Sequence, residues 1–229
     1  MIYYKPIGFQ SIFDTFLLHL AMDDLQLNPL YEKVIDDLMG QQYSIVDDFF
    51  TKEEVGFLRA ALLEKYDEDR FKKSAIGNQA NEKVVDAIRG DFILWLDENN
   101  ANNAENRFFN KLNDFKDYLN RTCFMGINEK EFHYALYPEG TFYKRHLDTF
   151  QNDSRRKLSM VCYLNDEDWK PEYGGELTIY LDENGSEKEI NVYPVQGRMV
   201  VFESQILEHE VKPVKRERLS ITGWLKTRG

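Results

Sequence analysis

The chain has 229 residues, of which 42% are hydrophobic and 14% aromatic, and its formal net charge is −11 at pH 7. This length accommodates one sizeable domain with an appendage, and the apolar content excludes a disordered chain. The excess of acidic residues excludes sequence-independent binding of nucleic acid and favours a basic partner instead.

Cysteine usage and the N-terminal residues indicate the compartment. The two cysteines, Cys123 and Cys162, are too few for a disulfide framework or a zinc ribbon. The start, Met1 to Pro6, lacks the basic and apolar regions of a signal peptide, and no apolar run approaches the length of about 18 residues that a membrane span needs. We therefore expect a reduced, cytoplasmic protein without membrane contact.

The N-terminal part carries a helical pattern of apolar residues. Residues 11–39 repeat apolar positions at helical spacing, and Asn28-Pro29 interrupts them, which predicts two short amphipathic helices. We assign residues 1–42 to a helical N-terminal extension. A strand at Tyr43–Phe49 then opens the main domain, residues 43–229.

Helices and loops come next in the chain. Thr51 with Glu54 has the spacing of a capping box, which predicts a helix that runs to about Tyr66. Residues 67–86 and 99–106 are polar and predict loops, with a strand at 88–96 between them. Apolar spacing from Phe108 to Leu119 predicts a second helix.

From Glu131 onward the pattern changes to short alternating strands. Asn184-Gly185 is a strong hairpin signal within this part. Eight such strands indicate a double-stranded β-helix, or jelly-roll, at about residues 131–228, in a mainly β fold with supporting helices (α+β). The expected strands are 132–137, 142–148, 157–165, 176–181, 189–192, 198–203, 209–211 and 218–226.

A metal site is predicted on these strands. Side chains at i and i+2 of a strand share a face, so His146 and Asp148 project together. With His209 they form two imidazoles and one carboxylate, the facial triad that holds non-haem Fe(II) and leaves coordination positions open. Taken alone, His-x-Asp is more often a surface pair or a satisfied core histidine, and the same three ligands also suit zinc.

An alternating run after His209 favours iron. Arg218, Ser220, Thr222 and Trp224 fall on one face, with apolar residues on the other. An Arg fork binds a carboxylate in bidentate geometry and cannot lose its charge on burial. This face therefore predicts a small anionic ligand beside the metal, which simple zinc hydrolysis does not need.

Taken together, these motifs resemble the Fe(II)/2-oxoglutarate-dependent dioxygenases, and more narrowly the prolyl hydroxylases of the oxygen-sensing (egl-nine) type and their bacterial relatives. The resemblance covers about residues 43–228. It is carried by Ile45–Phe49, Ile88–Asp91 with Trp95, Tyr137-Pro138, Tyr143–Asp148, Cys162–Asn165, Trp169, Gly174-Gly175, His209–Val211 and Arg218–Trp224.

The resemblance implies cofactors and a reaction. Fe(II), 2-oxoglutarate and O2 would be used, succinate and CO2 released, and ascorbate could serve as a supporting reductant. Asp148 implies hydroxylation, since halogenating members lack this carboxylate. Arg218, where the collagen-type enzymes have Lys, favours the intracellular branch. The expected partner is a protein or peptide with a proline-containing loop, and the oligomeric state is left open.

The resemblance also implies roles for individual residues. Beside Arg218, the co-substrate would be bound by Tyr163 at its distal carboxylate, by Tyr137 near its chelating end, and by Thr222 and Leu177 along the pocket wall. The residues expected to bind the prime substrate are Arg89, Asp91, Trp224, Arg145 and His133, the last replacing an apolar residue of the family. From the pattern alone, Tyr163 and Trp224 are equally core aromatics, and Arg89–Asp91 a surface ion pair.

The function expected from the sequence is therefore hydroxylation of a prolyl residue in a protein. One alternative keeps the chemistry but changes the substrate to a free amino acid, another side chain or a small metabolite. A second is a non-catalytic jelly-roll interaction module, against which the intact triad together with Arg218 speaks.

Overall fold

The computed structural model describes residues 27–74, 88–149 and 154–228. Its helices are α2 (Pro29–Gln41), α3 (Lys52–Asp67) and α4 (Asn103–Cys123), with 3-10 turns η1 (Glu98–Asn100) and η2 (Pro171–Tyr173). Its strands are β1 (Tyr43–Val46), β2 (Lys72–Lys73), β3 (Phe92–Trp95), β4 (Ile127–Tyr137), β5 (Tyr143–His146), β6 (Arg156–Tyr163), β7 (Leu177–Glu183), β8 (Ser186–Val192), β9 (Met199–Glu203), β10 (Glu208–Val211) and β11 (Arg218–Thr227).

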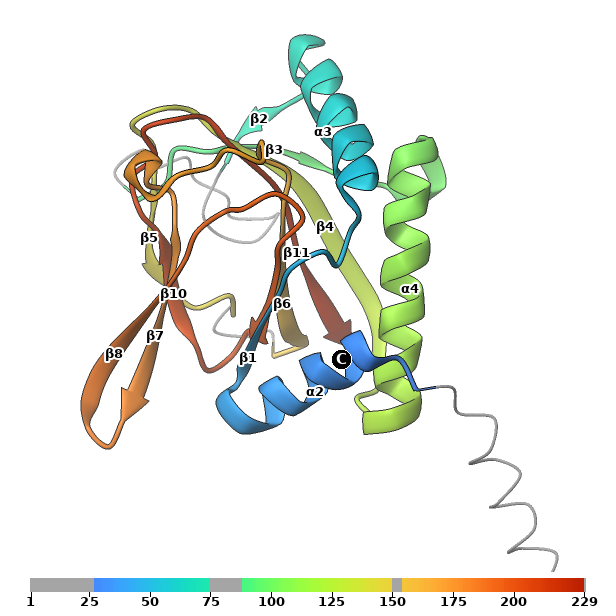
Figure 1. Cartoon of the computed structure of the whole chain (residues 1–229). Coiled ribbons are helices and arrows are strands. Elements are labelled where there is room, and N and C mark those ends of the chain that lie inside the picture. The colour runs from blue at the N-terminus through green and yellow to red at the C-terminus, as the bar shows by residue number, and fades with distance from the viewer. Residues whose placement is uncertain (1–26, 75–87, 150–153, 229) are drawn as a thin grey trace, which may run out of the picture.

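Two antiparallel sheets face each other (Figure 1). The larger sheet has the order β1-β9-β6-β11-β4-β3-β2, and the smaller has the order β5-β10-β7-β8. The eight strands expected after Glu131 are all present as β4 to β11, and the jelly-roll in a mainly β fold is confirmed. Within the described residues, every paired strand runs antiparallel, as alternating patterns joined by tight turns indicate.

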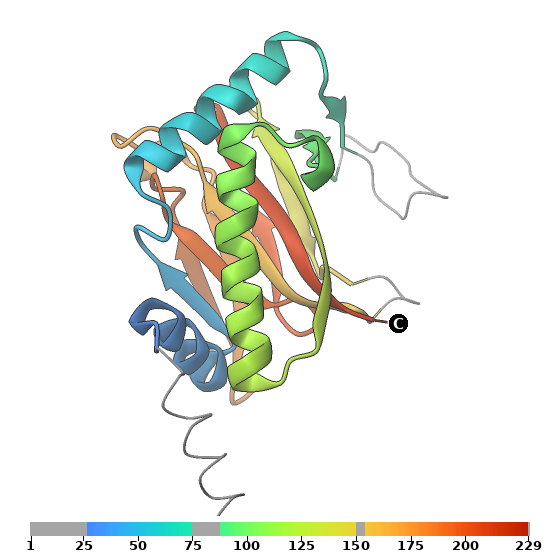
Figure 2. The same ribbon diagram turned by 90° about the vertical axis from the view of Figure 1, so that its right-hand side faces the viewer.

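The helices cover the outer face of the large sheet. Figure 2 shows α3 and α4 lying across that face, with β11 behind them. The core between them contains Leu58 of α3, Phe115 of α4, and Leu219 and Ile221 of β11. The other face of β11 looks between the two sheets, so the predicted division of this strand into an apolar and a polar face is confirmed.

Capping residues set where the helices begin. Thr51 and Glu54 form the expected capping box of α3. Helix α4 begins at Asn103, inside the stretch predicted as a loop, because Asn102 and Glu105 form a second capping box. The first turn of α4 is polar, so its apolar period starts later than the helix itself.

The N-terminal prediction is tested only in part. Asn28 caps α2 and Pro29 is its first residue, so the predicted interruption is the start of the second helix. Tyr31 of α2 packs on Phe115, at 5.0 Å between ring centroids. The first predicted helix and most of the loop at 67–86 lie outside the described residues, and the domain boundary near residue 42 stays a prediction. Strand β3 is shorter than expected, at Phe92–Trp95.

No helix in the described part of the chain combines the length and the apolar character needed to cross a membrane.

Close packing of β11 on β4 makes Gly223 a test of the fold. A Cβ atom there would lie 2.1 Å from the Glu131 carbonyl oxygen and 2.5 Å from the Phe132 ring. Gly223→Ala is therefore expected to lower the free energy of unfolding in urea by about 1–3 kcal/mol. Gly56→Ala is the matched control, because a Cβ at this position in α3 meets no atom within 4 Å. It should stabilise the chain by about 0.5–1 kcal/mol; equal midpoints for both variants would contradict the steric argument.

Candidate active site

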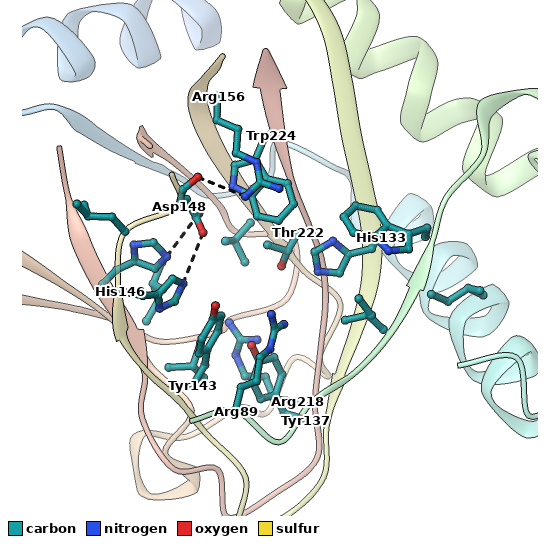
Figure 3. Close-up of a pocket in the computed structure, with 18 of the residues that line it drawn as sticks. Arg89, His133, Tyr137, Tyr143, His146, Asp148, Arg156, Arg218, Thr222 and Trp224 are labelled. Carbon is teal, nitrogen blue, oxygen red and sulfur yellow. Dashed lines mark hydrogen bonds and ion pairs between the residues drawn. The ribbon is translucent and has the colours of Figure 1, made fainter. Parts of the chain in front are cut away.

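The site lies between the two sheets, and strand register brings its wall together. Trp95 of β3 pairs with His133 of β4, which pairs with Thr222 of β11, which pairs with Val161 of β6. Residues directly opposite each other across antiparallel strands share a face. All four line one cavity of about 520 Å³ (Figure 3).

Three potential metal ligands meet on the opposite wall. His146 ends β5 and pairs in register with His209 of β10, and Asp148 follows two residues after His146. The Nε2 atoms of His146 and His209 each lie 3.5 Å from a carboxylate oxygen of Asp148. One ligand atom from each of the three residues lies within 4.8 Å of the others. The predicted triad is brought together, and it can hold a metal ion.

Backbone contacts orient both imidazoles. His146 Nδ1 is 2.7 Å from the Lys144 carbonyl oxygen, and His209 Nδ1 is 3.1 Å from the Leu207 carbonyl oxygen. A carbonyl oxygen only accepts, so each Nδ1 carries a proton, and each Nε2 faces Asp148. Metal-binding histidines usually make such a hydrogen bond from the ring nitrogen that does not bind the metal.

Protonation in the triad suits metal binding. Burial lowers the pKa of His209 to about 4, and the nearby His146 ring acts in the same direction. Burial alone would raise the pKa of Asp148, but His209, His146 and a hydrogen bond from Ser159 outweigh it and hold this pKa well below its usual value. At neutral pH the site therefore presents a carboxylate and a neutral His209.

Arg218 is a buried cation on the floor of the same cavity (Figure 3). Its side chain is among the largest fully buried ones, and its residue is 1% exposed. It donates from Nε to the Gly175 carbonyl oxygen at 3.0 Å and from an amino group to Ser220 at 3.3 Å. Within the described residues no carboxylate pairs with it, so a buried positive charge faces the cavity without an anion.

The other residues predicted to bind the co-substrate surround Arg218. Its guanidinium lies 4.9 Å from the ring centroid of Tyr137 and 5.0 Å from that of Tyr163. Leu177 and Thr222 line the cavity. The Tyr163 hydroxyl is buried and makes no hydrogen bond within the described part of the chain. A phenol beside an unpaired guanidinium can bind one carboxylate together with it.

Four of the five residues predicted to bind the prime substrate belong to this region. Arg89 lines the cavity and forms an ion pair of 2.6 Å with Asp91, which is fully buried and holds Arg89 in place. His133 and Trp224 form the aromatic wall with ring centroids 5.7 Å apart. His133 Nδ1 and Trp224 Nε1 are buried without a hydrogen-bond partner among the described residues.

Arg145 is not brought into the cavity. It pairs with Glu208 at 2.5 Å and Glu187 at 2.7 Å, and stacks on Tyr180, on the outer face of the small sheet. Side chains alternate along a strand, so the inward direction of His146 turns its neighbour outward. Arg145 therefore lies outside the cavity that contains the other predicted substrate residues.

The structure adds residues that the sequence reasoning missed. Tyr143 lines the cavity and stacks on His146 at 3.7 Å between ring centroids, because the register between β5 and β10 shifts and puts both residues on one side. Arg156 lies 3.4 Å from the ring centroid of Trp224 and donates to the Asp148 carbonyl oxygen at 3.3 Å. The Tyr143–His146 motif was a signal for Tyr143; the pattern held none for Arg156.

The residues present fit a metal ion and a dicarboxylate. Two Nε2 atoms and one carboxylate form a facial donor set on one wall. The buried, unpaired guanidinium of Arg218 and the orphaned hydroxyl of Tyr163 need an acceptor, since a buried charge or polar group without a partner is costly. A ligand with a carboxylate at its far end would satisfy both.

His133 gives this wall a measurable pH dependence. Burial, reinforced by the Arg89 guanidinium, lowers the pKa of His133 from 6.5 to about 3. Below pH 6.5 the His133 imidazole binds a proton in the unfolded chain but not in the folded chain, so this residue destabilises the fold as the pH falls. Between pH 7.5 and 5 the wild type should lose about 2 kcal/mol more of its unfolding free energy than His133→Leu. Urea titrations at both pH values measure this; an equal loss in both proteins would contradict it.

Comparison with known proteins agrees with this geometry. A family model described as the 2OG-Fe(II) oxygenase superfamily matches residues 132–226. A prolyl-4-hydroxylase crystal structure from Pseudomonas putida is 38% identical, with a TM-score of 0.76, and the match covers 87% of this chain and 100% of that one. A Trichoplax adhaerens prolyl hydroxylase, solved with a hypoxia-inducible factor peptide fragment, is 25% identical with a TM-score of 0.74, covering 93% of both chains.

A curated relative gives the same answer. The hypoxia-inducible factor prolyl hydroxylase of Caenorhabditis elegans is 28% identical over an alignment 220 residues long, which covers 90% of this chain. The chain spans only 29% of the length of that relative. The fold, the His-Asp-His cluster and these likenesses agree: the chain belongs to the 2OG-Fe(II) oxygenase superfamily, in the group that contains the prolyl hydroxylases.

Proposed function

We propose that this protein is an Fe(II)- and 2-oxoglutarate-dependent dioxygenase that hydroxylates a prolyl residue of a protein substrate and releases succinate and CO2. The observation that carries the proposal is the pairing of His146, Asp148 and His209 on one wall with the unpaired, buried Arg218 in the same cavity. A metal site alone would also suit a hydrolase. The anion-binding floor supports an enzyme that binds a dicarboxylate next to its metal.

Each residue of the triad and the floor has a task in this proposal. His146 and His209 would bind iron through Nε2 and Asp148 through its carboxylate, while Arg218 and Tyr163 hold the distal carboxylate of 2-oxoglutarate. Tyr137, Leu177 and Thr222 line the space between. When bound, iron and 2-oxoglutarate supply the activation of O2 and the oxidising power for hydroxylation.

The protein's own contribution is position and charge. Asp148 with one negative charge and 2-oxoglutarate with two are balanced by Fe(II) and Arg218, so the closed site carries no net charge. Two backbone carbonyls keep both imidazoles in the metal-binding tautomer. The aromatic wall of Trp95, His133 and Trp224 would exclude water from the side where the substrate enters.

A peptide substrate is supported by the relatives and by the shape of the site. The Trichoplax adhaerens enzyme binds a peptide, and the cavity here extends from the triad to the strands β2 and β3. Arg89, kept in place by Asp91, together with His133 and Trp224 would contact this peptide. We also propose a cytoplasmic setting, supported by two cysteines that are both free thiols; ascorbate as a reductant stays a prediction.

Succinate release measured with Fe(II) and 2-oxoglutarate tests the proposal. We expect turnover to rise when proline-containing peptides are added, and a +16 Da product that fragmentation places on proline. Hydroxylation of another residue type would support the same chemistry with a different substrate. Bound metal without any turnover of 2-oxoglutarate would refute the enzymatic function and favour an interaction module.

A further inference from the structure

The cavity has a charge opposite to that of the chain. The whole sequence contains 40 acidic and 29 basic residues. Among the described residues that line the cavity, Asp148 is the one acidic side chain. Six basic side chains line it: Arg70, Lys72, Lys73, Arg89, Arg156 and Arg218.

The inner part of this positive charge is accounted for. Arg89 is neutralised by Asp91, which lies behind the cavity wall. If the proposed function holds, Arg218, Asp148, iron and 2-oxoglutarate cancel one another. The charge that this bookkeeping leaves over includes Arg70 and Lys72, and neither residue has a part in holding metal or co-substrate.

Strand register places this excess along the path to the metal. Lys72 of the edge strand β2 pairs with Ile93 of β3, which pairs with Ala135 of β4. Paired residues share a face, so the Lys72 side chain lies on the same face of the sheet as Ile93, which lines the cavity. Lys72 is exposed and forms no ion pair within the described residues. The basic side chains therefore begin at the sheet edge.

The described partner of a second cation at this edge is weak. Arg70 is 3.6 Å from Glu68, and both side chains are about half exposed. Glu68 does not line the cavity, so an incoming anion meets the Arg70 guanidinium first. Exposed pairs of this kind contribute little and are readily exchanged for others.

We propose that the cavity selects an acidic peptide segment, in which Asp or Glu residues flank the hydroxylated residue. The net charge of the chain points to a basic partner, but recognition follows the local field at the site rather than the total charge. Lys72 and Arg70 attract the flanking carboxylates at the sheet edge. This inference rests on the proposed function, because it concerns the substrate of that same site.

A peptide library separates the two proposals. Chymotryptic peptides from a whole proteome, which keep an unbiased range of charged flanks, are incubated with the iron- and 2-oxoglutarate-loaded enzyme, and prolines that gain 16 Da are identified. We expect Asp and Glu to be enriched about twofold to fivefold per position, the range of exposed ion pairs. Flanking positions are scored over about five residues on each side of the hydroxylated proline, because an extended residue advances about 3.3 Å. The enrichment should fall as salt is raised.

Charge reversal at the sheet edge is the decisive comparison. The double variant Arg70→Glu and Lys72→Glu should lose the acidic enrichment or replace it with Lys and Arg. Lys52→Glu is the matched control, because Lys52 is an exposed residue outside the cavity that is paired with Glu167. It should keep the wild-type preference.

The outcomes of this experiment are distinct. Hydroxylated prolines without acidic flanks, or an enrichment that survives the double reversal, would overturn the inference and leave the proposed function standing. The absence of any hydroxylated proline, together with absent 2-oxoglutarate turnover, would refute the proposed function itself. Hydroxylation confined to peptides with basic flanks would show that the total charge of the chain governs recognition.

Discussion

Replacing Arg218 with Met is expected to lower kcat/KM for 2-oxoglutarate by about 10²- to 10³-fold, the cost of truncating one partner of a buried charge pair. The same change should raise the unfolding free energy of the metal-free, ligand-free protein by about 1–2 kcal/mol. In that state Arg218 is a buried cation without a described carboxylate partner, and its desolvation is uncompensated. Loss of function and gain of stability in one variant would identify a residue retained for its ligand.

Ligand-dependent melting measures both effects. Adding 2-oxoglutarate with a redox-silent metal should raise the Tm of the wild type, because a ligand that binds only the folded state stabilises it. The Met variant should melt higher without the ligand and respond little to it. Arg218→Lys is the control: it keeps the charge but not the fork, so it should lose affinity without gaining stability. An unchanged response to 2-oxoglutarate in the Met variant would rule out Arg218 as the anion site.

Regular strands made much of this site predictable. The alternation of Arg218, Ser220 and Thr222 along β11 follows from the period of a strand, and the structure keeps a regular register from Arg218 to Leu225. His146 and Asp148 could be placed together by the same rule. Jelly-roll topology then brings His209 opposite His146, which the family resemblance implied and spacing alone could not show.

Irregular backbone and distant contacts were beyond this reasoning. A register shift between β5 and β10 turns Tyr143 to the same side as His146, against simple alternation. Arg145 was assigned from a motif without regard to the strand face, and the structure places it outside the cavity. Arg156 reaches Trp224 from another strand, and no local pattern contains that contact. The start of α4 could likewise not be predicted from its apolar spacing, because its first turn is polar.

Replacing Asp148 with Ala is expected to have the largest effect on metal binding. It removes the one negative ligand of the triad and leaves two imidazoles, which lie at the end of β5 and in β10. Hydroxylation should be lost, and the affinity for Fe(II) or Co(II) should fall by more than the factor of about 10–100 that loss of a supporting hydrogen bond costs. Calorimetric titration with Co(II), and its absorption bands, would measure this without turnover.

Ser159→Ala provides the graded comparison. Ser159 Oγ donates to Asp148 Oδ2 at 2.7 Å, and Ser204 Oγ lies 2.9 Å from Ser159 Oγ, with all three groups buried. A hydroxyl has a single proton, so when Ser159 donates to Asp148 it must accept from the Ser204 hydroxyl. Metal affinity should therefore decrease in the order wild type, Ser204→Ala, Ser159→Ala, Asp148→Ala. Co(II) bound by Asp148→Ala as tightly as by the wild type would place the metal elsewhere and remove the basis for the proposed chemistry.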